Sequence, residues 1–363
     1  MKQLYSITLA LAITAAMPLA NAQRAAVTTH FNSMIHHNDP PQYVPTQQYS
    51  GTIRSWGHGY LKVAMKNWEV GFHKFQPNVK FDDTLVSSAA AIAGLYSGRA
   101  DIGVLAREIT PPEVAAYEKM TQQKLFAVDV LTGSLGNPDK IMALGIFVNK
   151  NNPLAQLTFD QLDAIFSAEL RRGEKDPIRI WGQLGLTGEW ANRSIQPYSG
   201  PAFEAPGYFF SQTVLNGSVL WNCDLKQVDD LPMPNAHDLD GYQRIVDAVG
   251  ADRYAIGISG AGYENQNAKL IAIARPGGSF VLPSPQNVAD RTYPLSRPVR
   301  FYINNGPRVP PNRIVLEFFR YILSREGQQD AQREGEFFAL PNAVDLRERA
   351  HLAATPVQGP LAR

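Results

Sequence analysis

Three short stretches carry the residue types that bind small anions: Gly57-His58-Gly59-Tyr60, Ser87-Ser88 and Ala106-Arg107. The two serines precede an apolar run that begins at Ala89, where a serine hydroxyl can cap the first turn of a helix. A helix N-terminus offers unpaired N–H donors and the positive end of the helix dipole, and an arginine adds a fixed positive charge. The chemistry indicated is therefore capture of an anion. For the serine stretch alone, the alternative is an ordinary capped helix that binds nothing.

Each of these stretches follows an expected strand. We predict strands at Thr52–Trp56, Val79–Phe81 and Ala100–Leu105, separated by helices over Tyr60–Phe75 and Ser87–Ser97. This β-α-β-α-β order predicts a mainly parallel sheet with helices on its faces. Ligands of such sheets bind beyond the carboxyl ends of the strands, so the three stretches are expected to converge at one edge.

The rest of the chain predicts a second α/β lobe and a return to the first. The expected strands of the second lobe are Ile141–Asn149, Ser194–Tyr198 and Ala255–Ser259, with helices at Thr158–Phe166, Tyr208–Leu215 and Asp240–Val249. Within it, Ser199-Gly200-Pro201 begins a loop between a strand and a helix, which is typical of a turn. After a proline-punctuated link at Tyr293–Pro298 come a strand at Val299–Asn304 and helices at Pro311–Arg325 and Gly327–Gly335.

The N-terminus predicts export. Lys2, an apolar run over Leu4–Leu19 and Ala20-Asn21-Ala22 form a signal peptide, so residues 1–22 would be removed and the mature chain would begin at Gln23. Export predicts a periplasmic or extracellular location. The signal carries one basic residue and no acid, so its loss takes 34 basic residues to 33 against 33 acids, and the net charge from +1 to 0. A neutral chain argues against nucleic-acid binding. Residues 23–50 are polar and proline-containing, which predicts a flexible arm that includes His36 and His37.

Enzyme and metal signatures are missing from the sequence. Cys223 is the only cysteine, so no internal disulfide and no cysteine-based metal site can form; a buried apolar filler is favoured over a reactive thiol. We find no nucleophile–base pairing, no H-E-x-x-H and no G-x-S-x-G. The prediction is a protein without catalytic residues, metal or cofactor.

Several ordered segments together resemble the periplasmic phosphate-binding proteins that feed phosphate ABC transporters. The segments that carry the resemblance are Ala143–Leu154, Leu157–Ser167, Ile180–Gly185, Gly188–Trp190, Tyr242–Val249, Ala255–Ile258 and Tyr293–Pro298. The resemblance runs from about Thr52 to Leu340. It implies a type II periplasmic binding protein fold, with two α/β lobes, two crossover strands and a ligand cleft between the lobes. Lobe 1 would hold residues 51–142 and 298–363, and lobe 2 residues 143–297.

The resemblance also implies a function: a monomer that binds phosphate or a related small oxyanion and delivers it to an inner-membrane ABC permease. The family uses helix N-termini, hydroxyls, an arginine and an acidic residue. This chain departs from that pattern, because His58 stands where a hydroxyl is expected and Leu105-Ala106 where a serine or aspartate is expected. In the loop Gln196–Gly207, the resemblance implies that Ser199 and Gly200 bind the ligand, with a simple turn as the alternative. This loop lacks the family's arginine and contains Glu204, which would repel an anion if it faced the cleft. These changes leave open a second function, as a sensor, adhesin or scaffold.

Two candidate residues have structural alternatives. His58, if charged, could pair with an anion and strengthen binding at low pH, or it could be a turn residue that faces solvent or caps a helix. Arg107 could line the cleft, or it could form a structural ion pair with Glu108 or Asp101.

Overall fold

The computed structural model describes residues 40–136, 140–229, 240–305, 312–333, 335 and 337–354. The predicted signal peptide, the expected cleavage site and the pair His36-His37 lie outside the described residues. In the part that is described, no helix has both the length and the apolar character needed to cross a membrane.

The first sheet has five strands in the order β2-β1-β3-β12-β4. Their bounds are β1 Gly51–Gly57, β2 Val79–Leu85, β3 Ile102–Val104, β4 Phe126–Thr132 and β12 Pro298–Ile303. β1 pairs in parallel with β2 and β3, as predicted. β12 runs antiparallel to both β3 and β4. β4 was not predicted, and it places the returning strand β12 inside the sheet rather than at its edge.

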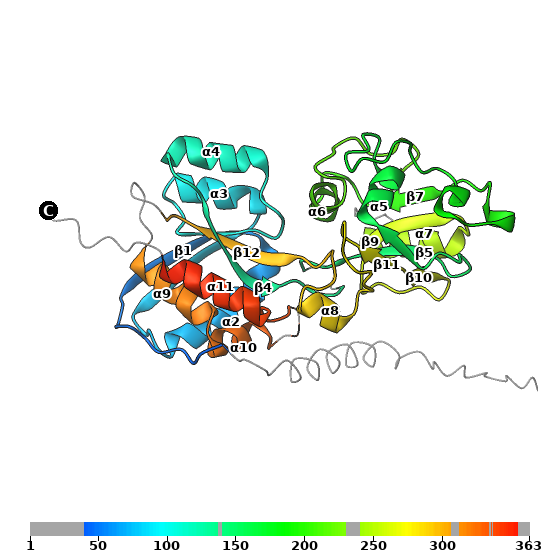
Figure 1. The fold of residues 1–363 in the computed structure, drawn as a ribbon. Coiled ribbons are helices and arrows are strands. Elements are labelled where there is room, and N and C mark those ends of the chain that lie inside the picture. The colour runs from blue at the N-terminus through cyan, green and yellow to red at the C-terminus, as the bar shows by residue number, and fades with distance from the viewer. Residues whose placement is uncertain are drawn as a thin grey trace, which may run out of the picture. The chain divides into compact units, whose positions relative to one another are not determined.

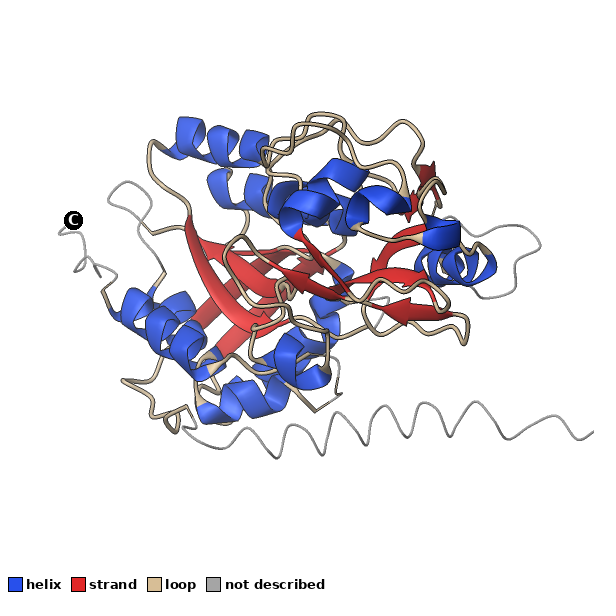
Figure 2. Cartoon of the chain, turned by 45° about the vertical axis from the view of Figure 1, so that its right-hand side comes forward, coloured by secondary structure: helices blue, strands red, loops and turns tan. Residues whose placement is uncertain are grey.

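Helices cover both faces of this sheet (Figures 1 and 2). On one face lie α3 Ser88–Tyr96 and α4 Pro111–Thr121, and on the other α2 Lys62–His73, α9 Arg313–Ile322, α10 Arg325–Ala331 and α11 Asn342–Ala353. A short 3-10 turn, η1 Gly59–Leu61, leads into α2. α2 buries one face, because Met65, Trp68 and Phe72 are inaccessible while Val70 stays exposed. Burial of one stripe of each helix builds the core.

Residues 40–50 differ from the flexible arm expected over residues 23–50. Tyr43 is buried, and its hydroxyl donates to Glu317 Oε1 at 2.8 Å. Thr46 donates to the same carboxylate through its backbone N–H and its hydroxyl, at 3.2 and 2.8 Å. Part of the polar character of this segment therefore serves specific hydrogen bonds to α9, through Tyr43 and Thr46.

The second sheet has the order β10-β5-β9-β7-β8. Its strands are β5 Leu144–Asn149, β7 Gln196–Ser199, β8 Lys226–Gln227, β9 Ala255–Gly260 and β10 Ala268–Leu270; β6 Gln156–Thr158 pairs separately with β11 Ala272–Ala274. The helical segments are α5 Phe159–Phe166, η2 Trp181–Leu184, η3 Gly188–Trp190, α6 Ala205–Thr213, α7 Gly241–Ala251 and α8 Pro285–Ala289. α7 packs its buried Ile245, Val246 and Val249 against this sheet.

The chain passes between the two sheets twice, once from β4 to β5 and once from β11 to β12. The two crossings are hydrogen-bonded to one another, by Gly133 N–H to Arg297 O at 2.8 Å and by Leu144 N–H to Leu295 O at 3.2 Å. Two α/β sheets joined by two adjacent crossings are the architecture that the sequence predicts.

Candidate functional site

The carboxyl ends of three strands are level in the first sheet. Gly57, the last residue of β1, is paired with Leu85 at the end of β2 and with Val104 at the end of β3. The loops that follow therefore start at one edge, and His58 N–H donates to Val104 O at 3.0 Å. A side chain at Gly57 would collide with this carbonyl group, because an added Cβ would lie 1.9 Å from Val104 O. The predicted convergence of the first three loops is present.

The two serines at the start of α3 have different roles. Ser87 is the N-cap, and its hydroxyl accepts the N–H of Ala89 at 3.2 Å. Ser88 is buried, and its hydroxyl accepts the N–H of Ala106 at 3.0 Å, which ties α3 to the loop that carries Arg107. A hydroxyl that accepts one hydrogen bond still has its own hydrogen to donate. Ser88 can therefore fix the loop and bind an anion at the same time.

His58 caps the 3-10 turn η1. Its Nδ1 accepts the N–H of Tyr60 at 3.2 Å, and its ring packs edge-on against the Tyr60 ring at 4.2 Å. Burial lowers the pKa of the His58 imidazole, and the positive charge of Arg107 lowers it further. An Nδ1 that accepts a hydrogen bond leaves the proton on Nε2 of a neutral ring. Of the two alternatives, the structure has the capping histidine, which offers a neutral N–H rather than a charge.

Arg107 forms an ion pair that the sequence analysis did not anticipate. Its Nη2 and Nη1 donate to the two carboxylate oxygens of Glu113 at 2.7 and 2.9 Å. Glu113 also accepts the N–H and the hydroxyl of Thr110, which completes the capping box of α4. The bond to Glu113 raises the pKa of the Arg107 guanidinium. The partners expected for Arg107 are wrong: Asp101 pairs with Arg54, and Glu108 with Arg297.

Tyr208 of α6 lies near Arg107. Its hydroxyl donates to Ile109 O at 3.5 Å, and burial raises its pKa while the charge of Arg107 opposes this rise. Close by, Arg297 is buried, pairs with Glu108 at 2.9 Å and stacks over Phe209 at 5.1 Å. Tyr208, Arg297 and Glu113 were not predicted from the sequence as residues near the site. The T-x-x-E spacing of the capping box was the signal for Glu113, whereas Tyr208 had no comparable motif.

Ser199 and Gly200 lie in the second sheet, at the end of β7. Ser199 is buried, and its carbonyl accepts the N–H of Val228 at 2.9 Å. An added Cβ at Gly200 would lie 3.1 Å from the Tyr242 hydroxyl. That hydroxyl donates to Glu204 at 3.0 Å, and Glu204 is the N-cap residue of α6. This helix N-terminus therefore already has a carboxylate beside it.

Comparison with known proteins identifies the family. The PBP superfamily domain matches residues 44–326. The phosphate-binding protein PstS of Pseudomonas aeruginosa is 32% identical over 306 residues, which cover 84% of this chain and 88% of that protein. The chain belongs to the phosphate-binding protein family.

Two solved structures support the same fold for this phosphate-binding protein family member. One is a possible phosphate binding protein from Planctomyces limnophilus, with a TM-score of 0.51, 22% identity, and coverage of 84% of this chain and 98% of that one. The other is PstS from Borrelia burgdorferi, with a TM-score of 0.55, 14% identity, and coverage of 80% and 99%. At these identities the likeness concerns the two-lobed fold alone.

The structure also bears on the expectations for metal ligands and for the single cysteine. Within the described ranges, no group of three or more His, Cys, Asp or Glu residues is arranged to hold a metal ion. Cys223 is exposed, so the prediction that it fills a buried apolar position is wrong. It lies in the loop between α6 and β8, in the second-sheet half of the chain.

Proposed function

We propose that this chain is a solute-binding protein for phosphate or a related small oxyanion, and that it delivers the ligand to an inner-membrane ABC permease. The observation that carries this proposal is the level ending of β1, β2 and β3, which brings His58, Ser88 and Arg107 to one edge beside the N-terminus of α3. Membership of the phosphate-binding protein family agrees with it. The ligand-binding residues would be Gly57, His58, Gly59, Tyr60, Ser87, Ser88 and Arg107, with Ser199 and Gly200 from the second lobe.

The donor set favours weak and tolerant binding. Burial of a dianion requires many hydrogen-bond donors. Glu113 balances the charge of Arg107, His58 is neutral, and Glu204 brings a carboxylate to the start of α6. Without a second-lobe arginine, binding would be weaker by roughly 1.5–3 kcal/mol, or about ten- to a hundredfold. Because Leu105-Ala106 stand where the family has a serine or an aspartate, discrimination between phosphate and fully ionised sulfate would be reduced.

The remaining parts of the proposal concern location and assembly. Residues 1–22 act as a cleaved signal peptide, and the mature chain works in the periplasm, or outside the cell, as a monomer. Residues 51–142 and 298–363 form one lobe, residues 143–297 form the other, and the ligand lies between them. No catalytic step is proposed.

Calorimetric titration of the exported protein with phosphate, sulfate, arsenate and simple carboxylates tests this function. Micromolar or weaker binding of several oxyanions is expected. Submicromolar binding restricted to phosphate would contradict the proposed tolerance, and absence of binding to every oxyanion between pH 5 and 8 would contradict the function itself. That second outcome would favour the sensor, adhesin or scaffold alternative, for which the specific observation is Glu204 beside the N-terminus of α6.

A further inference from the structure

Arg291 lies in the return crossing, between α8 and β12, and its backbone is unusual. Its φ of 60° lies in the left-handed region, which residues that carry a side chain rarely adopt. Such a conformation persists only where the surrounding contacts hold it, so it directs attention to what the side chain does.

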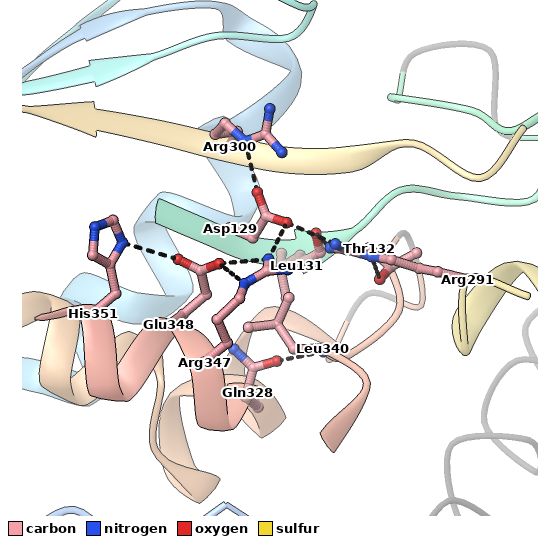
Figure 3. Close-up of polar contacts among 10 residues, drawn as sticks. All are labelled: Asp129, Leu131, Thr132, Arg291, Arg300, Gln328, Leu340, Arg347, Glu348 and His351. Carbon is pink, nitrogen blue, oxygen red and sulfur yellow. Dashed lines mark hydrogen bonds and ion pairs between the residues drawn. The ribbon is translucent and has the colours of Figure 1, made fainter. Parts of the chain in front are cut away.

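The guanidinium of Arg291 binds the end of β4 with all three of its nitrogens (Figure 3). Nε donates to Thr132 Oγ1 at 2.8 Å, Nη1 to Asp129 Oδ2 at 2.7 Å and Nη2 to Leu131 O at 3.0 Å. β4 is the strand from which the first crossing departs. One side chain of the return crossing thus fixes three acceptors at the origin of the outgoing crossing.

The residues just after Arg291 bind the other end of the outgoing crossing. The Tyr293 hydroxyl donates to Leu144 O at 2.7 Å, and Leu144 N–H donates to Leu295 O at 3.2 Å. Leu144 is the first residue of β5 in the second sheet. Residues 291–295 therefore contact both ends of the outgoing crossing, the end of β4 through Arg291 and the start of β5 through Tyr293 and Leu295.

Asp129 pairs with several arginines, so the role of Arg291 can be compared with that of another arginine bound to the same carboxylate. Arg300 Nε donates to its Oδ1 at 2.7 Å, and Arg347 Nη2 lies 3.4 Å from its Oδ2 (Figure 3). Burial alone would raise the pKa of Asp129, but the charges of Arg300 and Arg291 outweigh burial and lower it. Arg300 belongs to β12, within the first sheet, whereas Arg291 belongs to the crossing. Loss of either arginine removes an ion pair to the same carboxylate, but only loss of Arg291 removes the bonds that tie the return crossing to the end of β4.

We propose that Arg291 is a positioning residue of the hinge: by fixing the return crossing on β4 it restricts the separation of the two lobes and slows ligand release. The part that concerns ligand release rests on the proposed function, whereas the part that concerns lobe separation does not. The side chains of the anion site do not include Arg291, so its replacement leaves their contacts unchanged.

Single-molecule energy transfer between the lobes tests the proposal. The exposed Cys223 carries one dye in the second lobe, and Lys124→Cys, whose side chain is 92% exposed, carries the other in the first. Arg291→Ala is expected to broaden the distribution of distances without ligand, and Arg300→Ala to leave it as in the parent protein. Arg291→Lys should give a distribution of intermediate width, because a lysine ammonium can pair with Asp129 but cannot reproduce the three hydrogen bonds of the planar guanidinium. Equal distributions for Arg291→Ala and Arg300→Ala would overturn the proposal.

Stopped-flow measurement with phosphate and sulfate gives the second readout. Arg291→Ala should raise the dissociation rate roughly tenfold and change the association rate little, as expected when charged hydrogen bonds that hold a closed state are lost. If no oxyanion binds, the distance distributions still decide the role of Arg291, and the failure belongs to the proposed function. If Arg291→Ala does not fold, Thr132→Val removes the acceptor of Nε alone, and a distribution unchanged from the parent would contradict the proposal.

Discussion

Ser87 and Ser88 are adjacent serines whose hydroxyls each accept one backbone N–H, so they make a matched pair of substitutions. Ser88→Ala removes the acceptor of Ala106 N–H, a bond that is buried. Ser87→Ala removes the acceptor of Ala89 N–H, a bond that is exposed to solvent. In Ser87→Ala, water can replace the lost hydroxyl as the acceptor of Ala89 N–H, whereas in Ser88→Ala water has poor access to Ala106 N–H.

The magnitudes follow from this difference in burial. A buried N–H left without a partner costs about 1–3 kcal/mol, whereas loss of an N-cap hydroxyl costs about 1 kcal/mol. Ser88→Ala should also remove a donor to the anion, worth about 1 kcal/mol or roughly fivefold in affinity, before any shift of the Arg107 loop is counted. We therefore expect both substitutions to reduce stability, with Ser88→Ala the larger, and only Ser88→Ala to weaken binding by fivefold or more.

Urea denaturation and calorimetry with sulfate measure the two effects on the same preparations. Ser88→Thr, which keeps the hydroxyl, should recover most of the binding. If Ser87→Ala weakened binding as much as Ser88→Ala, either both hydroxyls would donate equally or α3 would fray, and the larger contribution expected of Ser88 would be wrong. If Ser88→Ala left binding unchanged, Ser88 would have to be removed from the proposed site.

Three further predictions concern single side chains. Arg107→Ala should abolish sulfate binding in calorimetry, while Arg54→Ala, which breaks a comparable ion pair with Asp101, should retain it; equal loss in both would point to a general structural effect. The pKa of His58 is lowered in the fold, so the unfolded chain takes up the proton first as the pH falls. The contribution of the neutral imidazole to stability is therefore complete above about pH 6.5 and is lost as the pH falls through the folded pKa. Between pH 7 and 5, the free energy of unfolding of His58→Asn should consequently fall less than that of the parent protein. Glu317→Ala should lower the free energy of unfolding by about 3 kcal/mol, because Tyr43 and Thr46 lose their acceptor. As a control, Glu118→Ala, which breaks an exposed ion pair with Lys124, should cost less than about 1 kcal/mol. Similar costs for the two substitutions would refute the role given to residues 40–50.

Local patterns predicted most of the first sheet, because a few consecutive residues are enough to indicate each of its strands and helices. The strands expected at Thr52–Trp56 and Val79–Phe81 are present as β1 and β2, and the serines expected to start a helix stand at the start of α3. β4 and α11 were missed, since their places depend on contacts distant in sequence. Asp129 and Arg347 meet across 218 residues, and no local pattern reports such a pairing.

The same distinction explains why the candidate site was only partly predictable. The convergence of His58, Ser88 and Arg107 follows from strand order, which the sequence expresses. Their hydrogen-bond states do not, because each depends on a backbone or side-chain partner fixed by packing. Arg107 could have paired with any of three nearby acids in the sequence, and the start of α4 selected Glu113. His58 could have been charged, and the N–H of Tyr60 together with burial selected the neutral ring.

These partners make the first-sheet half of the site rigid before any ligand arrives. Ser88 is fixed by Ala106, His58 by Tyr60 and Arg107 by Glu113, so little side-chain entropy is lost when an anion binds there. Tight capture also requires that the ligand bind the closed state better than the open one, and this difference must come from the second lobe. Near that side the Tyr208 hydroxyl already donates to Ile109 O, and at the start of α6 lies the carboxylate of Glu204. A preorganised half-site opposite a helix N-terminus that already has a carboxylate beside it should bind anions quickly and release them quickly, so changes that improve affinity should act on the second lobe and on the hinge.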